Sequence, residues 1–404
     1  MKTILIANFY TIEEGVLGGC ETVLMNLKQI LQEAGYKVET VTFQSAMKAM
    51  NMPIPVGYHR YAILDRAIII GKYLEQYEEM FGADVVIGFD GCLSFYTPKE
   101  ACVISYLNNP YKDINEWIWS SVNKNNPQAV ANYLEFGNVY PMLQERDLQR
   151  ANKIVVPSEY MSEYIMPSFV MKTGIGYSME VIPHGIDTDL FKPMDKAEMR
   201  EKHLKAEMRE KHLNDEFLRF GGLSQEDGRR RRTLMLTRFG KYKAIGVWNG
   251  AFHQVKNWDL MAELIRKRQD IFWVVIMKHL GVSEPKLKNV KLFNNVSYET
   301  VPELLNCADF YISVSQFESF GLCGVEAASC GLPVISTRTG IWKDWNPDNM
   351  GLFPDTSISS TSTAINSILK SRLNYTPREE IINSGLTLES WKWRWIELMK
   401  DLAI

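Results

Sequence analysis

Long hydrophobic segments are missing from this chain of 404 residues: no apolar run reaches the roughly 18 residues that a membrane-spanning helix needs. Cysteine and histidine patterns typical of metal sites are missing too. The six cysteines are scattered, and the six histidines form no H-x-x-H or H-E-x-x-H cluster, which argues against a zinc site. The net charge is only −3, so no strong field indicates nucleic-acid binding. We therefore expect a reduced, cytoplasmic protein without a metal ion or a nucleic-acid partner.

The composition is that of a globular protein. Hydrophobic residues make up 46% of the chain and charged residues 23%. A chain of 404 residues is too long for one ordinary core, so two domains of about 200 residues each are expected. The first residues, MKTILIANFY, are too few and too quickly polar for a signal peptide, and they predict a first strand.

Apolar and amphipathic segments alternate along the chain, which is typical of parallel α/β domains. Residues 3–7 predict a strand, 20–33 an amphipathic helix and 37–43 a second strand. Further strands are expected at 84–88, 101–106 and 153–156. A second series of elements is expected at 244–249, 258–266, 271–277, 290–293, 301–307 and 309–314. Between the two series, VIPHGIDTDLF at 181–191 is punctuated by Pro and Gly, so we place a domain boundary there.

Two glutamates, Glu318 and Glu326, flank a turn at Phe320 and Gly321 within FESFGLCGVEAASCGLP. A turn that precedes a helix presents free backbone N–H groups and the positive end of the helix dipole, and both favour a phosphate. Carboxylates repel phosphate, so their natural partners beside a bound diphosphate are sugar or ribose hydroxyl groups. The glutamate pair alone is more typical of a solvated helix face. Its place after the apolar strand expected at 309–314 favours a ligand site at the carboxyl end of that strand.

These features together resemble the retaining glycosyltransferases of the GT-B fold, family 4 type. Glu318 and Glu326 match the E-x7-E element of that family, and residues 181–191 match its IP-(N/H)-G-(V/I)-D linker. The resemblance implies an α/β protein with two Rossmann-like domains that face each other across a cleft. The expected units are an N-terminal acceptor domain at 1–182, a nucleotide-sugar domain at 183–388 with a charged insertion at about 195–243, and a helix at 389–404. This last helix would cross back to the N-terminal domain, or else dock on its own domain.

The resemblance also implies a reaction and roles for the motif. The protein would transfer a sugar from a UDP- or GDP-linked donor to a glycan, lipid or protein acceptor, with retention and without a cofactor. Glu318 would face the sugar and Glu326 would hold the ribose. The diphosphate or sugar would meet the turn, which consists of Ser319, Phe320, Gly321 and Leu322.

The segment WNGAFHQVKN at 248–257 lies where the family carries G-R-x4-K. Lys256 fits the lysine that would neutralise the diphosphate leaving group, although it could also be an ordinary surface lysine. Ala251 stands where the arginine is expected. Three explanations stay open: an unusual donor, a degraded site, or a substitute cation, for which the candidates are His253, Lys241, Lys243 and Arg338.

Smaller features complete the expected site. Gly18 and Gly19, before a predicted helix, resemble the first glycine-rich loop of the family, although such pairs are also common for steric reasons. Asn109 stands near the place where the family often has a histidine beside the sugar; its amide could bond a hydroxyl group or cap a turn. Asn294 follows a predicted strand at a place where these enzymes contact the base.

Two segments stand outside the resemblance. Residues 196–213 repeat KAEMREKHL in tandem. Because nine residues make two and a half helical turns, the apolar residues of the two copies cannot share one face, and we expect an exposed helical insertion. Residues 228–258 contain no acidic residue and many basic ones, which favours a solvated loop. The alternative is a basic arm that makes a weak peripheral contact with an acidic membrane or meets a phosphorylated acceptor.

Two other functions fit the same motifs. A non-catalytic scaffold would bind a nucleotide sugar without turnover, and the absent arginine makes this alternative credible. A sugar-nucleotide epimerase on the same fold would need a positioned acid and base. The sequence favours a hexosyltransferase and leaves the base, the sugar, the acceptor and the oligomeric state open.

Overall fold

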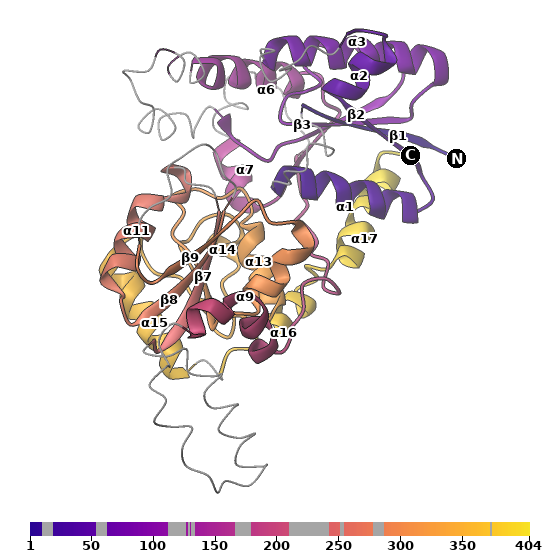
Figure 1. Cartoon of the computed structure of the whole chain (residues 1–404). Coiled ribbons are helices and arrows are strands. Elements are labelled where there is room, and N and C mark those ends of the chain that lie inside the picture. The colour runs from indigo at the N-terminus through magenta and orange to yellow at the C-terminus, as the bar shows by residue number, and fades with distance from the viewer. Residues whose placement is uncertain are drawn as a thin grey trace, which may run out of the picture.

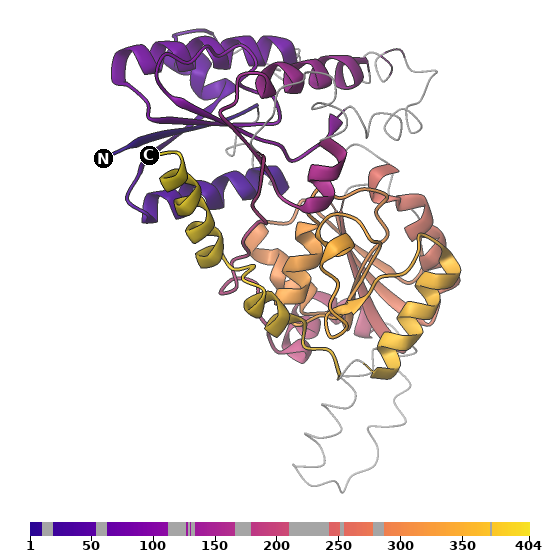
Figure 2. The same ribbon diagram turned by 180° about the vertical axis from the view of Figure 1, so that it is seen from behind.

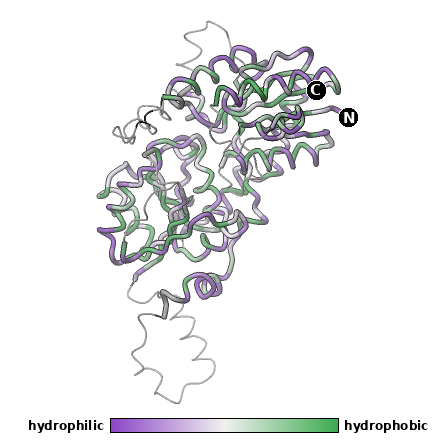
Figure 3. Tube along the Cα trace, turned by 45° about the horizontal axis from the view of Figure 1, so that its top comes forward, coloured by the Kyte–Doolittle hydropathy of each residue, from purple (hydrophilic) through white to green (hydrophobic). Residues whose placement is uncertain are grey.

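The computed structural model describes residues 1–9, 19–53, 63–111, 127, 130, 134–165, 179–209, 242–250, 254–277, 287–371 and 374–404. Two α/β lobes follow one another along the chain, and Figures 1 and 2 show them side by side with both termini on the N-terminal lobe. Hydrophobic residues gather along the strands inside each lobe (Figure 3). The two Rossmann-like domains predicted from the alternating pattern are therefore confirmed.

Within the described ranges, the N-terminal lobe has a parallel sheet of six strands in the order β2-β1-β3-β4-β5-β6. Successive side chains of a strand point to opposite faces, so Ile4 and Ile6 pack in one helix layer while Leu5 and Ala7 pack in the other. The strands are β1 (Thr3–Asn8), β2 (Lys37–Thr42), β3 (Val85–Phe89), β4 (Cys102–Tyr106), β5 (Lys153–Val156) and β6 (Met179–Val181).

Helices cover both faces of this sheet (Figure 1). One face carries α1 (Gly19–Glu33), whose apolar stripe is buried as its periodicity predicts. Beside α1 lies the last helix, α17 (Leu388–Asp401), which places Trp391 and Trp395 fully buried in the same core as Ile4. The other face carries α2 (Phe43–Ala49), α3 (Ile63–Phe81) and α6 (Tyr140–Leu148). Helix α17 thus stabilises the N-terminal lobe by packing into its core.

The C-terminal lobe repeats this plan. In the part of it that is described, a parallel sheet of six strands has the order β12-β11-β10-β7-β8-β9. Its strands are β7 (Ala244–Gly250), β8 (Ile271–Met277), β9 (Val290–Asn294), β10 (Phe310–Ser313), β11 (Val334–Ser336) and β12 (Gly351–Leu352). Its helices are α9 (Lys196–Arg209), α11 (Trp258–Lys267), α12 (Val301–Leu305), α13 (Leu322–Ser329), α14 (Ile341–Asp344), α15 (Ile358–Ser371) and α16 (Pro377–Asn383).

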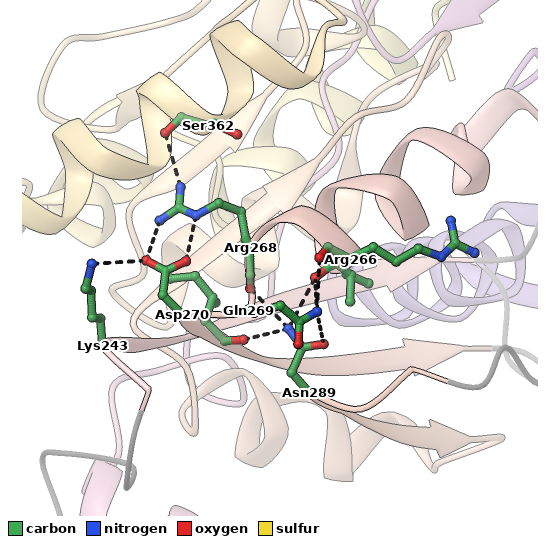
Figure 4. Close-up of polar contacts among 9 residues, drawn as sticks. Lys243, Arg266, Arg268, Gln269, Asp270, Asn289 and Ser362 are labelled. Carbon is green, nitrogen blue, oxygen red and sulfur yellow. Dashed lines mark hydrogen bonds and ion pairs between the residues drawn. The ribbon is translucent and has the colours of Figure 1, made fainter.

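A polar cluster fixes the amino end of this second sheet (Figure 4). The side-chain amide of Asn289 donates to three backbone carbonyl groups around the turn between α11 and β8. Next to it, Arg268 holds Asp270 through two N–H groups at 2.9 and 3.1 Å. Lys243, one of the candidate substitute cations, lies 3.5 Å from the same carboxylate. Because Lys243 precedes β7, it sits at the opposite end of the sheet from the carboxyl edge.

The prediction that the tandem repeat is an exposed insertion is wrong for its first copy. Met199 and Leu204 are buried in the core of the C-terminal lobe, and Arg200 is only 2% exposed. Arg200 lies 3.0 Å from the Asp309 carboxylate and donates to the carbonyl oxygen of Cys307. The half-turn shift in helical phase applies only between the two copies. Within the first copy alone, these three residues span only about 140° of the helix surface, which is enough for one buried face.

Candidate active site between the lobes

A cavity of about 370 Å³ lies between the two lobes, at the carboxyl ends of strands from both sheets. Parallel α/β sheets bind their ligands at this edge, because the strand ends and helix starts meet there. The N-terminal lobe contributes the start of α1 and the residues after β4. The predicted site residues that line the cavity are Gly19, Asn109, Lys256, Glu318, Ser319, Phe320, Gly321, Leu322 and Glu326.

The turn before α13 has the backbone of an anion-binding loop. Gly321 is the N-cap of α13 with φ 94°, in the left-handed region that favours glycine, and no side chain caps the helix. A Cβ atom at Gly321 would also lie 2.8 Å from Nε1 of Trp342. The first N–H groups of α13 have no intrahelical acceptor and point to the cavity end of the helix. The turn can therefore bind phosphate oxygen atoms through its backbone.

Glu318 and Lys256 form an ion pair beside this turn. Lys256 Nζ lies 2.7 and 2.8 Å from the two carboxylate oxygen atoms of Glu318. Burial by itself lowers the pKa of Lys256, but the adjacent Glu318 carboxylate outweighs it and raises the pKa above its ordinary value. The Ser315 hydroxyl donates to the same carboxylate at 2.6 Å. Along the described lining Lys256 is the only lysine or arginine, so it carries the positive charge of the site.

The second glutamate has a different environment. Glu326 is 3% exposed, and the Tyr298 hydroxyl donates to its Oε1 at 3.0 Å. Burial raises the pKa of the Glu326 carboxyl to about 8, and the hydrogen bond from Tyr298 lowers the pKa only in part. Near neutral pH the carboxyl is therefore largely protonated. A neutral carboxyl group can both donate to and accept from hydroxyl groups, and it does not repel a neighbouring phosphate.

On the N-terminal side, Asn109 is held by a buried carboxylate. Asp90 follows β3 with φ 52° and accepts from the backbone N–H groups of Asn108 and Asn109 and from the Asn109 side-chain amide, at 2.7 to 3.0 Å. Burial raises the pKa of Asp90 to about 6 against the effect of these bonds. Across the cleft, a Cβ atom on Gly19 would lie 3.9 Å from Leu322, so the starts of α1 and α13 face each other.

The two lobes also touch beside the cavity. The Ser158 hydroxyl, two residues after β5, donates to the carbonyl oxygen of Ser319 at 2.5 Å. The rings of Tyr160 and Phe317 lie 5.5 Å apart. Helix α7 (Glu159–Ile165) contributes Glu163, which pairs with Lys343 of α14. These contacts hold the turn before α13 against the N-terminal lobe.

Several expected residues have another place. Asn294 is not part of the cavity lining; the wall continues with Asn295, because β9 extends through Asn294. Arg338 is exposed and does not line the cavity. Gly18, His253, Ala251 and Lys241 lie outside the described residues, as does most of the basic segment at 228–258. Among the described residues, no cluster of three His, Cys, Asp or Glu side chains could hold a metal ion.

Sequence reasoning missed three residues that shape the site. His184, from the linker segment at 181–191, lines the cavity, as does Tyr298 beside Glu326. Asp90 orients Asn109. The Asp90-Gly91 pair after β3 is a sequence signal for a turn at the end of a strand. His184 is part of the linker motif at 181–191. No sequence pattern indicated Tyr298, because it lies in a helical turn 28 residues before Glu326, its hydrogen-bond partner.

Comparison with known proteins agrees with this geometry. A family model described as glycosyl transferases group 1 matches residues 224–386. Sucrose-phosphate synthase from Thermosynechococcus elongatus superimposes with a TM-score of 0.70 at 15% identity, covering 100% of this chain and 99% of that one. The Anabaena protein HepE, solved in complex with UDP-glucose, gives a TM-score of 0.63 at 12% identity, covering 99% of this chain and 100% of that one. This chain has the GT-B fold, and its residues 224–386 match the glycosyl transferases group 1 family.

Curated relatives of this GT-B protein match over shorter segments. The GPI3 subunit of phosphatidylinositol N-acetylglucosaminyltransferase from Saccharomyces cerevisiae is 36% identical over 149 residues, which cover 33% of each chain. This chain spans only 25% to 33% of the length of the curated relatives that it matches first. The fold is thus established, and the family match covers residues 224–386, which include Lys256, Glu318 and Glu326.

Proposed function

We propose that this GT-B protein transfers a hexose from a nucleoside diphosphate donor to an acceptor hydroxyl group, with retention at the anomeric carbon and without a metal ion. One observation carries the proposal. The interlobe cavity brings together the uncapped start of α13, Lys256 and two carboxyl groups at the carboxyl edge of the C-terminal sheet. One carboxyl group, Glu318, pairs with Lys256, and the other, Glu326, is buried with a raised pKa. A sugar nucleotide needs this combination, because its diphosphate is anionic whereas its sugar and ribose present hydroxyl groups.

The diphosphate would bind at the turn and at Lys256. In the structure Lys256 is neutralised by Glu318, so a donor must share this cation with the carboxylate. Leaving-group charge grows during transfer, and a lysine that is already positioned stabilises it without reorganisation. Ser315 keeps Glu318 in place when the lysine turns toward the diphosphate. Glu318 can then accept from a sugar hydroxyl group.

The ribose would bind at Glu326. Tyr298 occupies one oxygen atom of that carboxyl and leaves the other for the ribose hydroxyl groups. Its raised pKa keeps the carboxyl largely neutral, which limits repulsion from the diphosphate a few residues away. Asn109, fixed by Asp90, would meet the sugar from the N-terminal side, where the acceptor hydroxyl group enters.

The domain boundaries, location and partners belong to the same proposal. We assign residues 1–182 to acceptor binding and 183–388 to donor binding, with 389–404 as the crossing helix. All six cysteines are free thiols, which is consistent with a cytoplasmic protein. No helix in the described ranges is both long and apolar enough to cross a membrane. The UDP-glucose bound by HepE makes uridine donors the first choice, ahead of GDP-sugars. The acceptor would be a glycan, a lipid or a protein.

Calorimetry with UDP-, GDP- and ADP-sugars tests the proposal. The wild type should bind one base class equally well with magnesium and with a chelator. Lys256→Met should weaken binding at least tenfold, because a cation at the diphosphate is worth about 1.5 kcal/mol or more. Lys243→Met is the matched control, since Lys243 lies at the other end of β7 beside Asp270, and it should bind like the wild type.

The outcome also separates the alternatives. Release of nucleoside diphosphate after an extract that contains acceptors is added would establish transfer. If the protein binds the sugar nucleotide but neither releases nucleoside diphosphate nor epimerises the sugar, a scaffold is favoured. Binding of none of these sugars by the wild type would refute the donor site.

A further inference from the structure

His184 is a buried side chain on the cavity wall to which the sequence motifs assign no role. It comes from the linker between the lobes, is 4% exposed and lines the cavity. Its backbone is fixed on both sides: Ile182 N–H donates to Val156 O at 2.9 Å, and Ile186 N–H donates to Leu386 O at 2.9 Å. The imidazole therefore has a rigid base at the point where the two lobes meet.

Aromatic rings from both lobes enclose this imidazole. The ring of Phe320, in the anion-binding turn, packs edge-on with centroids 4.8 Å apart. The rings of Tyr106 and Trp391 lie 5.8 and 5.9 Å away. Burial among these rings lowers the pKa of His184 to about 3, so the imidazole is neutral under physiological conditions. A neutral imidazole carries one N–H donor and one acceptor nitrogen.

Tyr106 decides which nitrogen carries the proton. Its hydroxyl lies 2.8 Å from His184 Nδ1, and the tyrosine is fully buried. Among the described residues this hydroxyl has no other hydrogen-bond partner, and an unsatisfied buried O–H group is costly. The hydroxyl must then donate to Nδ1, which makes Nδ1 the acceptor and leaves the proton on Nε2. No described residue forms a hydrogen bond with Nε2. Because His184 lines the cavity, a ligand in the cavity can accept a hydrogen bond from this nitrogen.

We propose that His184 is a ligand-binding residue, whose Nε2–H donates a hydrogen bond to an oxygen atom of the sugar-diphosphate part of the donor. The inference rests on the proposed function, because it takes a nucleotide sugar as the ligand. It adds a neutral donor at a site where Lys256 is the only lysine or arginine along the described lining. The oxygen atom belongs either to the phosphates held at the Phe320 turn or to the sugar beyond them. Both offer the same acceptor chemistry.

Calorimetry on three variants tests this assignment with UDP and UDP-glucose, or with GDP and GDP-mannose if the panel selects guanosine. His184→Phe keeps a ring and removes the N–H, so it should weaken binding about tenfold. His184→Gln restores an N–H group and should recover part of the loss. His203→Phe is the matched control, because His203 pairs with Glu303 and does not line the cavity.

The two ligands locate the bond. Equal weakening for both assigns it to a phosphate oxygen atom, and weakening for the sugar nucleotide alone assigns it to the sugar. Binding of both within twofold of the wild type by His184→Phe would overturn the inference while the proposed function stands. A wild type that binds neither ligand would overturn both.

A second measurement needs no variant. In ¹⁵N NMR of the histidine side chains, the nitrogen shifts of His184 should be those of a neutral imidazole down to pH 5, with the proton on Nε2. Saturation with the nucleotide should shift the Nε2 resonance. A protonated Nδ1, or an Nε2 resonance unmoved by the nucleotide, would overturn the inference even if the variants fail to fold.

Discussion

Replacing Glu326 by Gln should stabilise the ligand-free protein, and increasingly so as the pH rises. The folded-state pKa of Glu326 is about 8, against an ordinary value of 4.5 for the unfolded chain. The folded state therefore binds one more proton between these values, so its stability falls as the pH rises from about 4.5 to 8 and changes no further above that. Glutamine is isosteric and still accepts from Tyr298, but it has no proton to lose.

The magnitude follows from the same two values. A tenfold change in proton affinity corresponds to about 1.4 kcal/mol. Between pH 5 and pH 8 the ionisation of this carboxyl should reduce the wild-type free energy of unfolding by about 3 to 4 kcal/mol. Other buried acids, Asp90 among them, also change the wild-type stability over this range. They are common to both proteins, so the difference between variant and wild type isolates Glu326.

Urea unfolding followed by tryptophan fluorescence at pH 5 and pH 8 measures the effect. Glu303→Gln is a control of opposite sign, because Lys202 and His203 lower the pKa of Glu303 and its removal should destabilise the protein above that pKa. If Glu326→Gln differs from the wild type by the same free energy at both pH values, the carboxyl is not held protonated, and the proposed neutral ribose partner is wrong.

Two further predictions concern the scaffold. Arg200→Met should cost about 3 kcal/mol or more in urea unfolding, because it leaves the 9% exposed Asp309 carboxylate without its buried partner, whereas the same change at the exposed Lys202 should cost under about 0.5 kcal/mol. Gly321→Ala should lower the melting temperature more than Gly82→Ala does. Both glycines have positive φ, but only the added Cβ at Gly321 meets another residue, Trp342. An equal loss of unfolding free energy for the Arg200 and Lys202 variants, or an equal drop in melting temperature for the two glycine variants, would contradict these predictions.

Local periodicity determined most of the secondary structure. The strands β5 and β8 have the predicted bounds, and α1 buries the predicted stripe, because a 3.6-residue or 2-residue period shows which face meets a core. The turn before α13 was also visible from sequence, since Glu318, Gly321 and Glu326 are close along one chain segment. Residues within one strand-turn-helix unit keep their relation in any fold that forms the unit.

Contacts between distant segments were decided only by tertiary structure. The Lys256–Glu318 ion pair joins residues 62 positions apart, and the Tyr106–His184 bond joins residues 78 apart, so neither leaves a periodic pattern. Burial likewise made Glu326 a neutral acid and brought Arg200 into the core. The sequence by itself determined the two-lobed α/β plan and the turn before α13, because both follow from local pattern. Packing of the lobes against each other decided which charges are paired and which groups line the cavity.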